Sequence, residues 1–236
     1  KGVTLEFVGF PPQTLKFLQA IRENNDKEWF EAHKEEYKKF ILEPSRAFVE
    51  EMGEHLMALE PTLHAIPKIN HSLFRIYRDI RRMGADKRPI KSRIGIIFWQ
   101  GRGSRLQSSS FYLHFSPDEL LVAAGVRWFE KPFLDAYRDY IKDERRRAQL
   151  QNVIDKLLAC GYEIFPKELK RYPKGFDASM TCGDLSLYKS MACKKVLEPK
   201  LIEEGAKLIQ TLYAIYEDML PLQQIVYEIS LRIKED

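Results

Sequence analysis

The chain has 236 residues, of which 44% are hydrophobic and 31% are charged, a balance typical of globular domains rather than of disordered or fibrous proteins. Its net charge of +4 does not indicate a general attraction to nucleic acid, and the absence of any run of eighteen apolar residues predicts no membrane span. The sequence has no internal repeat and no Gly/Ser/Pro-rich linker, so we expect a single domain over residues 1–236.

The cysteines and histidines bear on compartment and cofactors. The three cysteines include no C-x-x-C pair, which argues against a disulfide framework and favours a reducing compartment. The N-terminal residues lack the basic and apolar regions of a signal peptide, so we expect a cytoplasmic protein. The five histidines show neither an H-E-x-x-H motif nor a Cys-linked spacing, and the sequence therefore predicts no metal and no other cofactor.

The first third of the chain is predicted to be helical. Thr14 can cap a short helix, and Asn25, with Glu28 three residues later, gives the capping-box pattern for the start of a second helix. Pro44 suits the first turn of a continuing helix. Pro61 and Pro67 end the helical region.

The middle of the chain is predicted to form strands. Short β-rich or apolar segments cover residues 73–77, 93–99, 111–115 and 120–128. Within one of them, Phe111, Leu113 and Phe115 alternate with polar residues, as in a strand with one buried face. The S-P-D-E sequence at 116–119 is typical of a hairpin turn, and such short connections favour antiparallel pairing because parallel strands need long crossovers.

The last third is predicted to return to helix. Pro132 fits the first turn of one helix, and a second helix follows and ends near Gly161. Residues 162–198 look irregular, with a candidate strand at 187–192, and two closing helices are separated by Pro221. Together these elements predict an α+β fold with an antiparallel central sheet of about four to six strands, flanked by N- and C-terminal helices.

Positive charge is concentrated in one stretch. Residues 75–105 contain ten Lys or Arg and two Asp, a net charge of +8, whereas the rest of the chain carries −4. An anion-binding or nucleic-acid-binding surface is therefore best sought in this stretch.

The same stretch carries a resemblance. The segment RIYRDIRRMGADKRPIKSRIG is similar to the signature of a bacterial and fungal family called domain of unknown function 2461, which reads R-x-x-R-D-x-R-F, a short gap, K-x-P-Y-K and a glycine. The matching positions are Arg75, Arg78, Asp79, Arg81, Lys87, Pro89, Lys91 and Gly95. Arg82 and Ile90 stand where that pattern has Phe and Tyr.

Three further blocks resemble the same family in order along the chain, at residues 9–37, 111–126 and 169–176. The resemblance thus covers the whole chain. It implies a shared fold, and it implies no reaction, ligand or partner, because the family has no assigned function.

The charged segment supports two interpretations. Asp79 can pair with one or two of the arginines and fix a loop while the other cations are solvated. Alternatively, several cations converge on the carboxylate or phosphate of a small ligand, since guanidinium groups bind such anions through two parallel hydrogen bonds and lysine adds a point charge. The second interpretation predicts a site made of Arg75, Arg78, Asp79, Arg81, Lys87 and Lys91, with Asp79 orienting an arginine. Whether the protein is an enzyme is left open.

His114 is the candidate for proton transfer, since it lies on the polar side of its predicted strand and histidine titrates near neutral pH. The other interpretation of His114 is a half-buried, hydrogen-bonded side chain.

A separate hypothesis is a nucleic-acid-binding module that uses the basic patch together with Lys170, Arg171 and Lys174, which lie beside aromatic residues. A third is a protein-interaction domain without catalysis, and the sequence does not indicate an oligomeric state.

Overall fold

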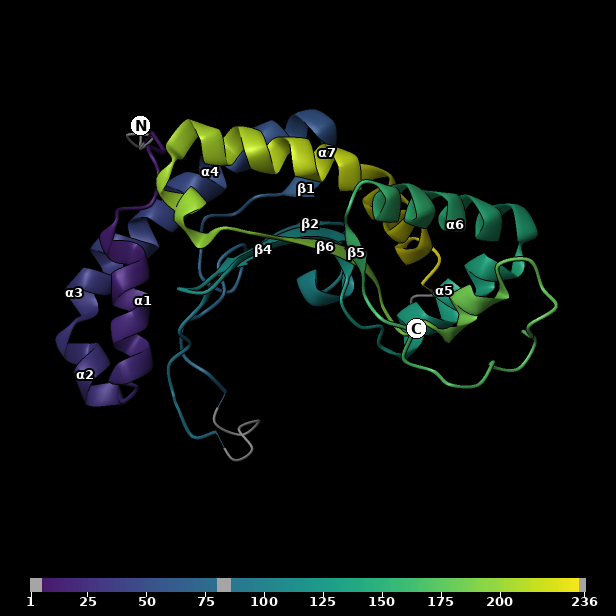
Figure 1. Cartoon of the computed structure of the whole chain (residues 1–236), viewed down its shortest axis with the longest axis horizontal. Helices are drawn as coiled ribbons and strands as arrows, with labels where there is room; N and C mark the ends of the chain where they lie inside the picture. The colour runs from purple at the N-terminus through teal and green to yellow at the C-terminus, as the bar shows by residue number, and fades with distance from the viewer. Residues whose placement is uncertain (1–5, 80–85, 234–236) are drawn as a thin grey trace. The chain divides into compact units, whose positions relative to one another are not determined.

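The structure is a computed structural model that describes residues 6–79 and 86–233 (Figure 1). The α-helices are α1 (Gln13–Glu23), α2 (Lys27–Ala32), α3 (Lys34–Tyr37), α4 (Glu43–Leu59), α5 (Lys131–Lys142), α6 (Glu144–Ala159) and α7 (Gly205–Ser230). A π-helical turn η1 (Lys38–Leu42) and the 3-10 turns η3 (Arg105–Gln107), η4 (Gly183–Leu187) and η5 (Pro199–Glu203) supplement them. The strands are β1 (Leu63–His64), β2 (Ile94–Gln100), β3 (Ser110–Phe115), β4 (Leu120–Val126), β5 (Glu163–Ile164) and β6 (Met191–Leu197).

The described strands form one antiparallel sheet in the order β1-β2-β3-β4-β6-β5, with helices before and after them along the chain. The predicted α+β class and the antiparallel sheet are therefore confirmed. The meander β2-β3-β4 follows the predicted segments closely, and its second turn lies at the predicted position, where the Ser116 hydroxyl accepts hydrogen bonds from the Asp118 and Glu119 amides.

Residue contacts divide the chain into two compact units, which we describe separately. The first unit comprises residues 1–98, 112–122 and 196–214, and the second comprises residues 99–111, 123–195 and 215–236. Strands β2, β3, β4 and β6 and helix α7 each contribute residues to both units. The expected single-domain organisation stays a prediction, because a division by contacts does not show whether the two parts fold separately.

An aromatic cluster forms the core of the first unit. The ring of Phe10 lies 6.1 Å from that of Phe48 on α4 and 4.7 Å from that of Phe115 on β3. Phe48 in turn lies 6.4 Å from Phe98 on β2. All four side chains are almost completely buried, so these rings fasten the N-terminal segment and α4 onto the strands.

Pro44 is accommodated near the start of α4 by the preceding π-helical turn. Proline has no amide hydrogen to donate to the carbonyl four residues earlier, which here belongs to Phe40. The buried Thr14 hydroxyl of α1 donates to that carbonyl oxygen instead, at 2.6 Å. A side chain from another helix thus supplies the hydrogen bond that Pro44 cannot make.

In the second unit, the buried side chain of Arg147 connects three segments of the chain through hydrogen bonds. This residue of α6 is only 4% exposed, and its guanidinium donates to the carbonyl oxygens of Ile141 (2.7 Å), Lys142 (3.2 Å) and Thr181 (2.6 Å). Two of these acceptors are the last carbonyls of α5, which have no partner within their own helix. Arg147 therefore ties the end of α5 to α6 and to the loop before η4.

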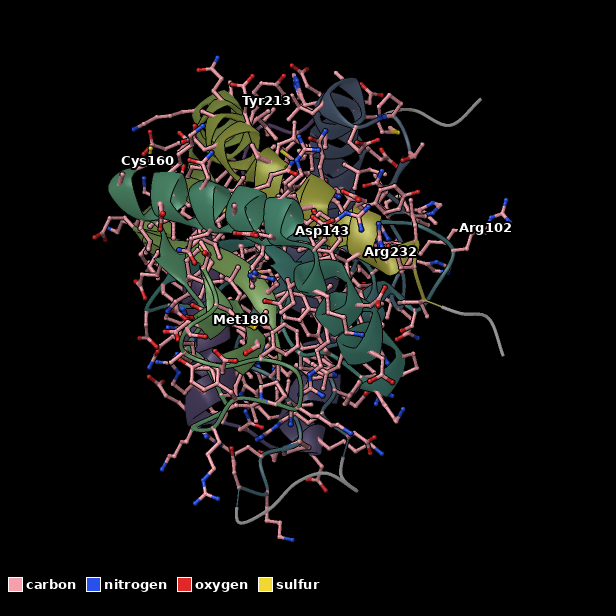
Figure 2. All side chains as sticks on the ribbon, turned by 90° about the vertical axis from the view of Figure 1, so that its right-hand side faces the viewer. Arg102, Asp143, Cys160, Met180, Tyr213 and Arg232 are labelled. Carbon is pink, nitrogen blue, oxygen red and sulfur yellow. The ribbon has the colours of Figure 1, made fainter. Side chains whose placement is uncertain are left out.

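Asp143 separates α5 from α6 and caps the second helix, because its side chain accepts a hydrogen bond from the Arg146 amide at 2.9 Å. Figure 2 shows Asp143 and Cys160 at opposite ends of α6.

Within residues 6–79 and 86–233, none of the helices combines the length and apolar character that crossing a membrane requires.

Five sequence-based expectations are corrected in detail. Thr14 lies within α1 rather than at its cap, and its hydroxyl donates to the Phe40 carbonyl oxygen. The cap of α2 is Asp26, whose carboxylate accepts from the Trp29 amide, rather than Asn25. Segment 73–77 forms only isolated bridges at Leu73 and Tyr77 instead of a continuous strand. The strand expected at 187–192 begins further along the chain, at Met191, as β6 (Met191–Leu197). Helix α7 runs through Pro221 without ending, because residues on both sides of the proline, such as Met219 and Leu222, are completely buried and packing outweighs the lost hydrogen bond.

Candidate functional site

The basic stretch folds into a short hairpin in the first unit, which we call the arginine hairpin (residues 75–79 and 86–91). Tyr77 and Ile90 form an antiparallel bridge, and the backbone is held by hydrogen bonds from the Arg78 amide to the Pro89 oxygen (2.8 Å) and from the Lys91 amide to the Ile76 oxygen (2.9 Å). Ile76 and Ile90 are buried. The hairpin is thus anchored by its apolar side chains, while its cations remain at the surface.

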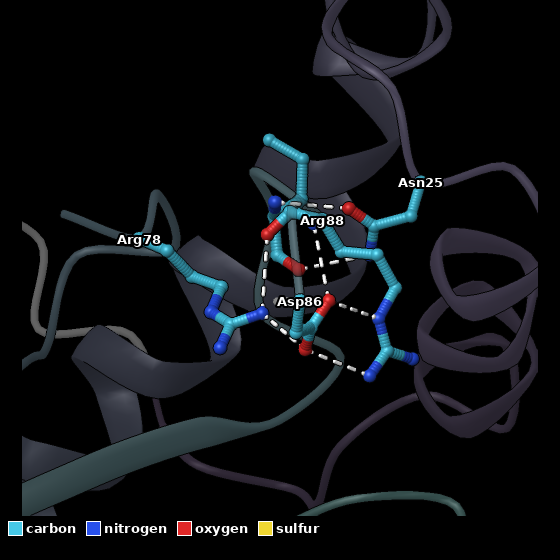
Figure 3. A network of polar contacts seen from close by, with 5 residues as sticks. Asn25, Arg78, Asp86 and Arg88 are labelled. Atoms are coloured by element: carbon cyan, nitrogen blue, oxygen red, sulfur yellow. Dashed lines mark hydrogen bonds and ion pairs between the residues drawn. The ribbon is translucent and has the colours of Figure 1, made fainter. Parts of the chain in front are cut away.

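Asn25 attaches this hairpin to the turn between α1 and α2. Its side-chain nitrogen donates to the Ile90 carbonyl oxygen at 2.9 Å, and its side-chain oxygen accepts from the Ile90 amide at 3.0 Å (Figure 3). The Tyr77 hydroxyl donates to Glu31 of α2 at 2.5 Å, and burial together with this bond raises the pKa of Tyr77 to about 12. Two blocks that carry the family resemblance, one around Asn25 and one around the arginines, therefore meet in space.

The carboxylate of Asp86 lies between two guanidinium groups. Arg88 donates from Nε to Oδ1 (2.8 Å) and from Nη2 to Oδ2 (2.9 Å), and its backbone amide also donates to Oδ1 (3.1 Å). Arg78 donates from Nη1 to Oδ2 at 2.6 Å (Figure 3). These hydrogen bonds, first those from Arg88 and then that from Arg78, hold the pKa of Asp86 far below its usual range.

Positive charge exceeds negative charge in the described part of the hairpin, which contains five Lys or Arg and two Asp. Arg78 and Arg88 share the single carboxylate of Asp86, and their side chains are 32% and 57% exposed. Lys87 is exposed and has no hydrogen bond or ion pair among the described residues. The hairpin therefore presents cations that its own carboxylates do not fully neutralise.

None of the other predicted site residues is among the hydrogen-bond partners that the structure gives the Asp86 carboxylate within the described chain. Arg75 and Asp79 form a long ion pair of 3.9 Å, and the Lys91 ammonium donates to the Arg75 carbonyl oxygen at 2.7 Å. Arg81 lies outside the described residues. The structure brings Arg78 together with Asp86 and Arg88, two residues that sequence reasoning counted as charges but did not assign to the site.

Arg22 adds a second guanidinium–carboxylate pair in the same unit. It binds both oxygens of Asp118 in the hairpin turn, at 3.1 and 2.7 Å. These hydrogen bonds raise the pKa of Arg22, and the nearby positive charge of Arg88 opposes the increase. Arg22, which binds the S-P-D-E turn, and Arg88 of the arginine hairpin therefore lie close enough for their positive charges to repel each other.

His114 is buried on β3, with 6% of its surface exposed, and its Nε2 lies 2.9 Å from a carboxylate oxygen of Glu119. Its ring also packs edge-on against Tyr112, at 5.7 Å. The hydrogen bond agrees with the second interpretation, but His114 is buried rather than half-buried, so the expected polar side of the strand is not exposed at this residue. A role in proton transfer stays a prediction.

The second basic motif lies in the second unit. Lys170, Arg171 and Lys174 are exposed, Phe176 is buried, and the partly exposed Tyr172 donates its hydroxyl hydrogen to Asp184 at 2.6 Å. In the part of the chain that the structure describes, no three His, Cys, Asp or Glu side chains are grouped so that they could hold a metal ion.

Comparison with protein families gives one match, to the family described as conserved hypothetical protein (DUF2461), over residues 13–224. That range includes Asn25, the arginine hairpin, His114 and the 170–174 motif. A search of curated proteins finds no match.

Proposed function

The chain belongs to the DUF2461 family, whose model matches nearly its whole length, and we propose that it binds an anionic small molecule at the arginine hairpin. Arg78 and Arg88 would hold the anionic group, and Lys87 would add positive charge beside them. The natural ligands of such an arrangement are carboxylates and phosphates, because both match the paired hydrogen-bond donors of a guanidinium group.

One observation supports this proposal above all: two partly exposed guanidinium groups, from opposite sides of the hairpin, point at the same carboxylate. Two guanidinium groups share the single carboxylate of Asp86, so these three side chains together carry a net charge of +1. The uncompensated positive charge attracts a further anion.

The hairpin is also pre-organised for binding. Asn25 fixes the backbone at Ile90, and the Tyr77–Ile90 bridge fixes the opposite segment, so the backbone that carries Arg78 and Arg88 is already ordered before a ligand binds. Binding to a preformed site avoids much of the entropy cost of ordering side chains and backbone.

Thermal unfolding tests the proposal. We expect sodium phosphate or sodium succinate to raise the melting temperature above that in sodium chloride of equal ionic strength. In Arg78→Ala and Arg88→Ala, the apparent anion affinity should fall about tenfold, a loss typical of one charge-assisted contact. Arg145→Ala removes an exposed arginine of α6 and should behave as wild type. Equal stabilisation of all three variants would refute the site.

Nucleic-acid binding is the second candidate, supported by the exposure of Lys170, Arg171 and Lys174 beside the partly exposed ring of Tyr172. It requires a fluorescently labelled single-stranded oligonucleotide to bind with an affinity that falls steeply with salt. Replacing the three cations together by alanine should then abolish binding. If the oligonucleotide does not bind even at low salt, this candidate is excluded.

The protein-interaction hypothesis depends on exposed apolar residues. Trp128 is 43% exposed and Leu106 is 37% exposed, and Gln107 links their segments by donating to the Trp128 carbonyl oxygen at 3.1 Å. Scattered exposed apolar residues are normal on a protein surface, so this observation supports the hypothesis less strongly than the hairpin supports anion binding.

A further inference from the structure

We infer that the anion recognised at the arginine hairpin is a carboxylate, and that Asp86 is an internal competitor that occupies its place. This inference rests on the proposed function and specifies the ligand class of the same site. In the bound state, the carboxylate of the ligand would replace that of Asp86 on Arg78 and Arg88.

The contacts of Asp86 define the shape of the group that fits. Arg88 addresses the two carboxylate oxygens separately through Nε and Nη2, at 2.8 and 2.9 Å, which is the side-on match between a planar guanidinium and a planar carboxylate. The Arg88 amide adds a bond to Oδ1, and Arg78 adds one to Oδ2. Each oxygen thus accepts two hydrogen bonds, and a third oxygen, as in phosphate, has no corresponding donor among these four contacts.

The hairpin does not depend on Asp86 for its position. Its anchors are the Asn25–Ile90 hydrogen bonds, the Arg78–Pro89 and Lys91–Ile76 backbone bonds and the burial of Ile76 and Ile90. The Arg78 side chain also donates to the Arg88 carbonyl oxygen at 3.2 Å. Since these contacts remain when the Asp86 carboxylate moves away, the hairpin backbone and the Arg78 side chain stay in place. The Arg88 side chain, whose hydrogen bonds both go to Asp86, can then turn to another carboxylate.

Water compensates for part of the free energy that is lost when the Asp86 carboxylate leaves the two arginines. The Asp86 side chain is 38% exposed, so the released carboxylate is hydrated by the surrounding water. Exposed ion pairs contribute little to stability, because water and salt screen them. An external carboxylate therefore competes mainly against the high local concentration of Asp86, which is tethered two residues from Arg88.

Removing the charge of Asp86 should consequently strengthen binding. If Asp86 occupies the arginines most of the time, the apparent affinity is reduced by the fraction of free sites, and Asp86→Asn should bind carboxylates about tenfold more tightly than wild type. The asparagine amide cannot replace the carboxylate, because one of its two polar atoms is a donor facing other donors.

The test is an NMR titration of the ¹⁵N-labelled chain with sodium acetate and, separately, with inorganic phosphate, following the Nε signals of Arg78 and Arg88 at constant ionic strength. We expect Asp86→Asn to bind acetate about tenfold more tightly than wild type, with a smaller gain for phosphate. Asp86→Ser provides a second neutral variant. Asp135→Asn, which removes an exposed carboxylate paired with Lys131 on α5, should match wild type.

The outcomes separate this inference from the proposed function. Wild-type acetate affinity in both neutral variants would overturn the role of Asp86 while leaving the anion site intact. A larger gain for phosphate than for acetate would overturn the assignment of the ligand class. Absence of binding of either anion to wild type and to both neutral variants would overturn the proposed function itself.

Discussion

Arg147 in the second unit and the Arg78–Arg88 pair in the first carry the same guanidinium group in opposite surroundings. Arg147 is 4% exposed and uses its donors on three backbone carbonyls, with no carboxylate among its partners in the described chain. Arg78 and Arg88 are partly exposed and donate to one shared carboxylate. The comparison teaches that a buried arginine bound only to backbone carbonyls joins elements of the fold, whereas Arg78 and Arg88 keep part of their surface in water, which is what the proposed anion site requires.

The largest expected effect is that of Arg147→Ala. The substitution leaves the carbonyl of Ile141, whose bond to Arg147 is buried, and those of Lys142 and Thr181, whose bonds are partly buried, without their donor. Each loss costs about 1–3 kcal/mol, so we expect the free energy of unfolding to fall by about 3 kcal/mol. Urea denaturation measures this change. A loss below about 1 kcal/mol would show that water replaces the guanidinium, and the contrast with the surface arginines would then fail.

Asn25→Ala should have an intermediate effect on stability and a specific effect on binding. It removes two hydrogen bonds to the Ile90 backbone and should cost about 1–2 kcal/mol of unfolding free energy in a urea denaturation experiment, while anion binding weakens because the hairpin is no longer fixed.

Gln107→Ala is the matched control for Asn25→Ala. Gln107 makes the same kind of clamp in the second unit, donating to the Trp128 oxygen and accepting from the Glu130 amide at 2.9 Å. We expect a similar loss of stability without a change in acetate or phosphate affinity. If both variants weaken anion binding equally, Asn25 has no particular role in positioning the hairpin.

A smaller effect should appear in the pH dependence of stability. Because the folded-state pKa of Asp86 lies well below the usual value of 3.8, the ion pairs of Asp86 contribute stability above that value and lose it as the pH falls through the folded-state pKa. The difference in melting temperature between wild type and Asp86→Asn should therefore be largest near neutral pH and shrink below about pH 4. A difference independent of pH would show that the charge of Asp86 is not responsible.

The smallest effect concerns the cysteine thiols, for which the same contrast between a buried and an exposed group can be tested. Burial raises the pKa of Cys193 to about 12, whereas Cys160 is exposed at the end of α6. Titration of the native protein with a thiol-specific chromogenic reagent at pH 8 should modify Cys160 readily and Cys193 only after denaturation. Rapid reaction of Cys193 in the native protein would mean that its site opens locally. Cys160→Ser identifies the fast-reacting thiol.

Sequence reasoning predicted the fold class and much of the central sheet, because those features depend on local pattern. The alternation of Phe111, Leu113 and Phe115 predicts a strand with one buried face, and all three side chains are fully buried. The opposite face was not predicted to be buried, yet Ser110 and His114 are buried there as well. The turn after Phe115 is determined by Pro117 and Asp118, and the family match over residues 13–224 agrees with the resemblance found in the motifs.

The candidate site was only partly predictable. The density of cations in residues 75–105 indicated the segment that holds the arginine hairpin, and Arg78 was among the predicted residues, which stay a prediction. Arg88 and Asp86 were not assigned, because nothing in the sequence indicates which carboxylate two arginines share. The role of Asn25 was misread as a helix cap, since Asn and Asp are both good caps and the neighbouring Asp26 makes that bond.

What the sequence determined by itself was therefore local: the helical and strand periodicities, the hairpin turn and the concentration of positive charge. The tertiary structure alone decided that Asn25 binds the backbone of a residue 65 positions away, that Thr14 completes the hydrogen bonding at Pro44, and that α7 continues through Pro221. The physical reason is that these contacts join groups distant along the chain, and their free energy arises only when folding removes both partners from water together.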